Sequence, residues 1–264
     1  MKKVKLAFVM LPFVSLILAG CGGGHTEPSG TTSHETGFIP PKTEIEEAVE
    51  TVRDTLSRRN ITFKMTNNST SPGHVSTNNE TREIDGNKAH VFGTSQADDL
   101  PPVNTDCYFE VGETNYIYQF DGDKWVKTPV PYSLITDVTE STYGFEEAMA
   151  KMKESYTKPS AGVYLLENFS YDVSVAKMLE VAGQSTEGYT LVKETITIHQ
   201  KSMKFTMSEG KLVSYEQSGY AYSFPIDEDL KTIDAIEMQN YSSYTKIYDI
   251  EKLGTTVVNL PSVE

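Results

Sequence analysis

Apolar residues follow a helical period at the start of the folded part of the chain. Thr43 and Glu46 have the spacing of a capping box, in which each side chain binds the backbone amide of the other residue. The pattern predicts a helix that begins after Thr43 and ends before residues 58–60. Four apolar residues, three or four positions apart, form its buried stripe: Ile45, Val49, Val52 and Leu56.

The period then drops to two, which is the period of a strand with one buried face. Ile61, Phe63 and Met65 alternate with polar residues. No helical pattern interrupts the strands that follow, so we expect neighbouring strands to pair antiparallel. Turn residues separate these further predicted strands: residues 82–85, 88–92, 106–111, 115–120 and 124–127.

The middle of the chain returns to a helical pattern before more strands follow. Residues 144–156 predict an amphipathic helix whose apolar stripe includes Met149 and Met152, and residues 172–182 predict a third helix. The 225–239 segment is ambiguous between a short helix and a strand. Later strands are predicted at residues 190–198, 202–208, 212–218, 241–248 and 255–260.

The N-terminal segment has the pattern of an export signal. Three lysines precede a run of apolar residues that is too short to cross a ~30 Å hydrocarbon core comfortably. Leu18-Ala19-Gly20-Cys21 follows at once and resembles the lipobox of bacterial lipoproteins. The resemblance implies cleavage between Gly20 and Cys21, with diacylglycerol on the cysteine sulfur. We therefore predict a signal peptide over residues 1–20 and a lipid-anchored protein on the extracytoplasmic face of the cell membrane.

Charge and composition limit what the mature chain can do. The full chain carries a net charge of −14, and loss of the three signal-peptide lysines lowers it to −17, which argues against nucleic acid as a partner. Residues 21–41 are rich in Gly, Ser and Thr and predict a flexible tether. The remaining residues, 42–264, predict a single domain.

Catalytic and metal-binding patterns do not rise above background. Cys107 alternates with Phe109 on the buried face of a predicted strand, where a nucleophile would be unusual. If Cys21 carries lipid, Cys107 has no intramolecular disulfide partner. We predict a protein without enzymatic activity, cofactor or bound metal.

The order of elements behind the lipobox resembles the LolA/LolB/LppX-like lipoprotein superfamily. Two local features carry the likeness: the strand pair of residues 116–125, with an aromatic residue at its return, and the closing segment 254–261. The resemblance implies an α+β fold, an antiparallel open half-barrel of about ten strands with helices packed on its concave face. Members of the superfamily hold acyl chains in that cavity.

The side chains expected on the concave face have the adaptable character that suits an acyl ligand. The candidate lining consists of Phe63, Met65, Phe109, Met149, Met152, Met203, Phe205 and Met207. A filled core needs the same stripes, so a closed domain remains an alternative. In that case the protein would be a non-catalytic cell-envelope interaction protein, with an acidic surface that carries tyrosines such as Tyr215, Tyr220, Tyr222, Tyr241, Tyr244 and Tyr248.

Overall fold

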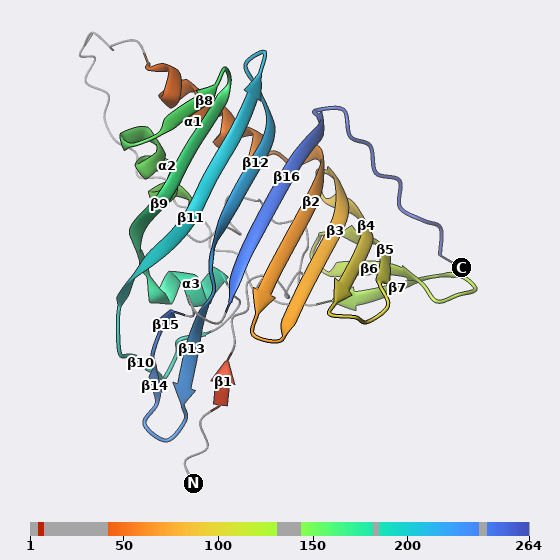
Figure 1. Ribbon diagram of the computed structural model, residues 1–264. Coiled ribbons are helices and arrows are strands. Elements are labelled where there is room, and N and C mark those ends of the chain that lie inside the picture. The colour runs from red at the N-terminus through yellow and green to blue at the C-terminus, as the bar shows by residue number, and fades with distance from the viewer. Residues whose placement is uncertain (1–4, 8–41, 131–143, 182–184, 238–241, 264) are drawn as a thin grey trace, which may run out of the picture.

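The structure is a computed structural model that describes residues 5–7, 42–130, 144–181, 185–237 and 242–263. Most strands of the described residues belong to one large antiparallel sheet that does not close on itself (Figure 1). The strand order in this eleven-stranded sheet is β7-β6-β5-β4-β3-β2-β16-β12-β11-β9-β8. Its strands are β2 (Asn60–Ser71), β3 (His74–Asp85), β4 (Lys88–Ala97), β5 (Val103–Glu110), β6 (Asn115–Phe120), β7 (Trp125–Val130), β8 (Thr157–Ser160), β9 (Val163–Ser174), β11 (Thr195–Ser208), β12 (Lys211–Tyr220) and β16 (Ser243–Leu253).

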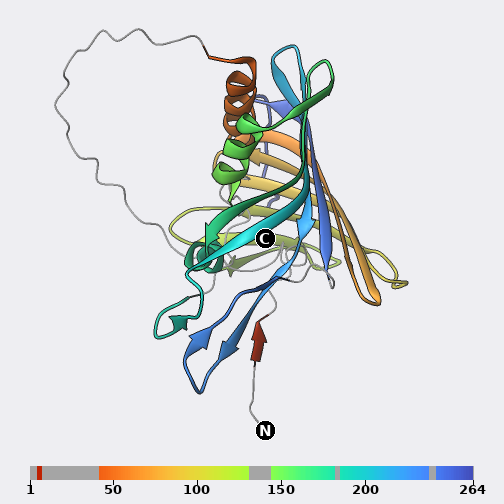
Figure 2. The ribbon, with the colours of Figure 1, turned by 60° about the vertical axis from the view of Figure 1, so that its left-hand side comes forward.

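The sheet curves around two helices. Figure 2 shows α1 (Glu44–Leu56) and α2 (Phe145–Glu154) against its concave side. The capping box that the sequence predicts for α1 is present, with both reciprocal bonds between Thr43 and Glu46. All four apolar residues of the predicted stripe are buried. The open half-barrel with helices on its concave face is therefore confirmed in outline.

A second, smaller sheet lies beyond one end of the large one (Figure 1). A third helix, α3 (Val175–Val181), precedes most of its strands in the chain. Within the ambiguous segment 225–239, the described residues 225–237 form short strands and turns and no helix, whereas residues 238 and 239 lie outside the described residues. The sheet consists of β1 (Lys5–Ala7), β10 (Thr190–Leu191), β13 (Tyr222–Asp227), β14 (Thr232–Ile233) and β15 (Ile236–Glu237). β1 lies within residues 1–20, so it is absent from a chain cleaved before Cys21.

The expectation of about ten strands is too low, and the middle of the chain explains part of the difference. Residues 163–174 form a long strand, β9, whereas the sequence predicted no element over residues 163–171 and a helix from residue 172. The predicted third helix begins later than expected, because residues 172–174 still pair with β11. The alternating buried residues of β9, such as Tyr171 and Val173, follow the strand period.

Two further boundaries differ from the prediction. The strands expected at 190–198 and 202–208 belong largely to one strand, β11, whose pairing with β12 shifts register between Gln200 and Ser202 and again between Thr206 and Met207. The first shift is typical of a bulge. It moves the alternation of buried and exposed residues by one position, so the sequence pattern looks like two separate strands. Residues 255–260 form no strand. Thr256 instead bonds Asn60 on β2 through its backbone amide, at 2.9 Å.

Candidate ligand-binding site

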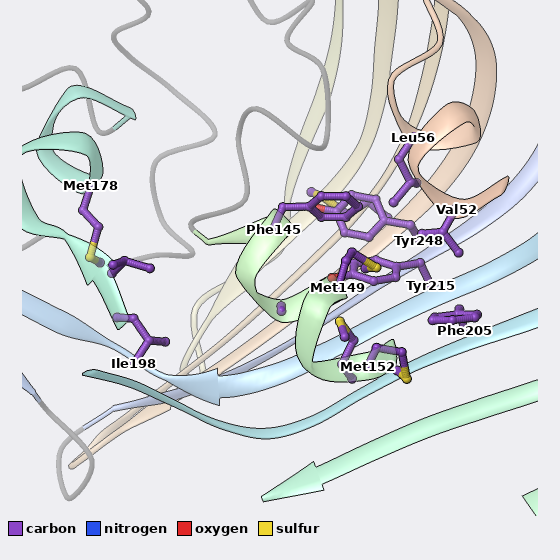
Figure 3. Close-up of a cluster of buried hydrophobic side chains, with 14 of the residues drawn as sticks. Val52, Leu56, Phe145, Met149, Met152, Met178, Ile198, Phe205, Tyr215 and Tyr248 are labelled. Carbon is purple, nitrogen blue, oxygen red and sulfur yellow. The ribbon is translucent and has the colours of Figure 1, made fainter. Parts of the chain in front are cut away.

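The predicted lining residues come together in the core between the helices and the sheet. Phe205 and Met203 on β11, and Met149 and Met152 on α2, have no exposed surface. Phe63, Met65 and Phe109 are also buried in this cluster. Figure 3 shows Met149, Met152 and Phe205 within it. Met207 is only partly buried and packs at the edge of the cluster.

Contacts between aromatic rings pack the part of this apolar cluster that lies between α2 and the sheet. The ring of Phe145 on α2 lies 6.3 Å from the ring of Tyr215 on β12. Phe205 stacks on Tyr164 at 5.1 Å, and Phe63 meets Tyr248 edge-on at 5.6 Å. Because these side chains fill the space under α2, an apolar ligand there would have to replace the contacts of the α2 methionines.

Helix α2 is held to the rest of the protein by its apolar face and by one bidentate ion pair. Arg53 on α1 donates to Glu146, with its Nε 2.8 Å from Oε1 and its Nη2 2.5 Å from Oε2. Gly144 precedes the helix at φ 61°, and it provides no side-chain cap. An added Cβ at Gly144 would lie 2.3 Å from the ring of Tyr171, so only glycine fits this entry to the helix.

Polar and charged side chains share the same face of the sheet, next to the apolar cluster. Glu80 on β3 is opposite Met65 on β2, and Arg82 is opposite Phe63, so both charged residues face the concave side. Arg82 Nε donates to Glu80, and the side chains are 14% and 7% exposed. Asn78 Nδ2 donates to the second carboxylate oxygen of Glu80, at 3.2 Å.

Lys246 on β16 extends this polar region. It is opposite Asn67 on β2 and Gln217 on β12, both of which are buried. Lys246 is itself partly buried. The pKa of its ammonium is lowered to about 8: desolvation by burial is the largest cause, the nearby Arg82 also lowers the pKa, and Glu80 partly offsets both by raising it. We call Glu80, Arg82 and Lys246 the charged cluster.

A neutral hydrogen-bonded group lies on the other side of Lys246. Gln200 Nε2 donates to the hydroxyl of Tyr171 at 3.2 Å, and the hydroxyl of Tyr244 donates to Gln200 Oε1 at 3.3 Å. Gly219 makes room for this amide, since an added Cβ would lie 2.1 Å from Gln200 Oε1. Burial raises the pKa of Tyr244 to about 12, so it stays protonated at neutral pH.

A depression of about 400 Å³ opens between α2 and the sheet beside this group. The residues that line it include Glu147, Lys151, Tyr171, Asp172 and Thr197, which carry polar groups. The depression therefore leads from solvent to Tyr171, at the border between the polar group and helix α2.

Sequence reasoning missed the charged cluster because it sorted strand residues by hydrophobicity alone. The signal was present: Tyr244, Lys246 and Tyr248 alternate on β16, so the lysine shares a face with two buried or partly buried tyrosines. A lysine that alternates with aromatic residues along a strand predicts a charged side chain on the concave face.

The surface tyrosines expected of a closed interaction protein are wrongly predicted for three of the six. Tyr215, Tyr222 and Tyr248 are at most 5% exposed and belong to the core. Tyr244 and Tyr220 are partly buried, and Tyr241 lies outside the described residues. Tyr215, Tyr244 and Tyr248 share the concave face of the large sheet, and Tyr222 adds its ring to the core from the small sheet.

Exposed aromatic side chains gather instead on the opposite, convex face, over β4 to β7. His90 stacks on Tyr108 with ring centres 4.1 Å apart, and Trp125 meets Tyr108 and Phe120 edge-on. Phe120 is 54% exposed and Phe92 is 36% exposed. We call these five residues the convex aromatic patch.

Across the described residues, no group of three His, Cys, Asp or Glu side chains could hold a metal ion. Cys107 is buried, as predicted, and desolvation raises the pKa of its thiol to about 12. Gly20 and Cys21 lie outside the described residues, so lipidation of Cys21 stays a prediction. No helix in the described part of the chain is both long and apolar enough to cross a membrane.

Comparisons with known proteins add little to this geometry. No family model matches the chain, and no curated protein matches it. A structure of EF1p2_mFAP2b bound to DFHBI shares 10% identity over 75% of this chain and 97% of that chain, with a TM-score of 0.20. The S-type phycobiliprotein lyase CPES from Guillardia theta shares 5% identity over 81% and 99%, with a TM-score of 0.24. Both TM-scores are below 0.5, so neither likeness bears on fold or function.

Proposed function

We propose that this protein is a lipid-anchored, extracytoplasmic lipoprotein whose half-barrel binds a lipid or another apolar molecule. The anchor rests on Leu18-Ala19-Gly20-Cys21 and the short apolar run before it. The observation that carries ligand binding is the concave face. It brings methionine and aromatic side chains from β2, β5, β11 and α2 into one continuous cluster.

Helix α2 is the element that gives a ligand access. Its methionines are unbranched and polarizable, so they repack around a flexible chain at low cost. Apart from its apolar face, the helix has one bidentate tie to α1, between Arg53 and Glu146. A ligand that takes over the contacts of Met149 and Met152 would leave α2 as a cover over the bound chain.

The test compares the amount of lipid bound to the wild type with the amount bound to a variant in which the methionine side chains of α2 are shortened. The mature chain, residues 21–264 with Cys21→Ser, is purified and examined by native mass spectrometry and lipid extraction. We expect co-purified lipid in the wild type. We expect more in Met149→Ala/Met152→Ala, because the shortened side chains compete less for the concave face.

Lys153→Ala is the matched control for this experiment, because Lys153 lies on the exposed side of the same helix. It should bind as much lipid as the wild type. A trimmed variant that is only less stable, together with a wild type that never carries lipid, would show a closed core and refute the proposal.

The convex aromatic patch favours a second candidate function, that of a non-catalytic cell-envelope interaction protein. Exposed aromatic residues that cluster on one face are typical of contact surfaces. Trp125 belongs to this patch and is the single tryptophan of the chain. Its fluorescence therefore reports on the convex face alone. Isolated envelope material that changes Trp125 emission, with no lipid on the concave face, would favour the second function.

A further inference from the structure

The charged cluster carries one more positive charge than negative charge. Arg82 is paired with Glu80, whereas no carboxylate of the described residues lies within ion-pairing distance of the Lys246 Nζ. A partly buried ammonium without a counter-ion is unfavourable, because it has lost part of its hydration. The surplus is notable in a chain whose net charge is −14.

The strand register places this surplus charge beside the apolar cluster. One cross-strand row of the concave face runs from Met203 through Gln217 and Lys246 to Asn67. The next row runs from Phe205 through Tyr215 and Tyr248 to Met65. On β16 the charged Lys246 is therefore only two residues, about 7 Å, from Tyr248 in the apolar row.

We propose that the concave face selects amphiphiles whose head carries a single negative charge, and that Lys246 binds this head with support from Arg82. This inference rests on the proposed function, since it assumes that an acyl chain occupies the apolar rows. The amides of Asn67 and Gln217 flank Lys246 and add polar character on both sides. A fatty-acid carboxylate and the phosphodiester of an anionic phospholipid both have the required charge.

The experiment measures head-group preference in the mature chain with Cys21→Ser. Binding of oleate and of oleyl alcohol is measured by displacement of a fluorescent fatty acid. Vesicles of dioleoylphosphatidylglycerol or dioleoylphosphatidylcholine then distinguish a phospholipid source of the negative charge from a free fatty acid. We expect the wild type to bind oleate about tenfold or more tightly than the alcohol, as one charge-assisted hydrogen bond allows.

Lys246→Met should remove most of this preference while leaving alcohol binding unchanged. The matched control is Lys252→Met, because Lys252 is exposed on the same strand. It should retain the wild-type preference. If oleate and alcohol bind equally well to the wild type, or if Lys246→Met keeps the preference, the charge-selective site is refuted while lipid binding stands. If neither ligand binds, the proposed function fails as well.

Discussion

Lys246→Met should make the protein more stable at neutral pH, although it removes a charged residue from a negatively charged chain. Lowering the pKa of this ammonium from 10.5 to about 8 costs the folded state about 3 kcal/mol at pH 7. Because Lys246 is only partly buried, solvent screening reduces this cost. We expect the free energy of unfolding to rise by about 1–3 kcal/mol. For a domain of this size, each kcal/mol raises Tm by about 2–4 °C.

The gain should depend on pH in a defined direction. Between pH 8 and 10.5 the unfolded chain binds a proton at Lys246 that the folded chain has released, so the wild type recovers stability as the pH rises through this window. The advantage of the variant is therefore full below about pH 8 and shrinks toward pH 10.5. Tyrosines and Cys107 that titrate in alkali affect both proteins alike and cancel in the difference.

Urea unfolding at pH 7, 8, 9 and 10.5 measures this difference without adding salt. Lys252→Met is the control and should change stability by less than about 0.5 kcal/mol at each pH. A Lys246→Met protein that is less stable than the wild type at pH 7 would refute the reasoning. So would a stability difference that does not vary with pH.

Three further predictions concern the anchor, the core and the polar group. Cys21→Ser should abolish incorporation of labelled fatty acid and leave unprocessed or mislocalised precursor; label that still enters the variant would contradict the lipobox. Phe205→Asp should lose its near-UV circular dichroism signal, because an unpaired charge at a fully buried site costs about as much as the whole stability of a domain. A variant that keeps the wild-type near-UV signal and melting temperature would show that this core is not packed. Gly219→Ala should destabilise by about 1–3 kcal/mol in thermal melts, since its Cβ would clash with Gln200, and adding Gln200→Ala should restore part of the loss.

The sequence predicts the elements whose period and end signals agree. Helix α1 has its stripe and its capping box, and both appear as expected. Strand β9 escapes sequence reasoning because Glu167, Asn168 and Ser170 interrupt its apolar pattern, although Phe169 and Tyr171 still point inward. Long-range pairing with β11 selects the strand there, and such pairing is not visible in a local window.

The candidate site also has one part that the sequence predicts and one part that it does not. The apolar lining follows from alternation, so Phe63, Met203 and Phe205 can be assigned to one face from the period of the sequence alone. The charged cluster depends on register, because Lys246 and Glu80 are far apart in sequence and meet only through the pairing of β16, β2 and β3. A sequence alone does not fix that register.

Among the described residues, the large open sheet is bordered by two strands that pair on one side only, and each of them contains a proline. β7 includes Pro129, and β8 includes Pro159. Proline cannot donate a backbone hydrogen bond, so both borders are poor templates for another copy of the chain. The half-barrel can thus remain open without growing into sheet-to-sheet polymers. Pro129→Thr and Pro159→Thr together would remove that protection and turn an isolated domain into an aggregation-prone one.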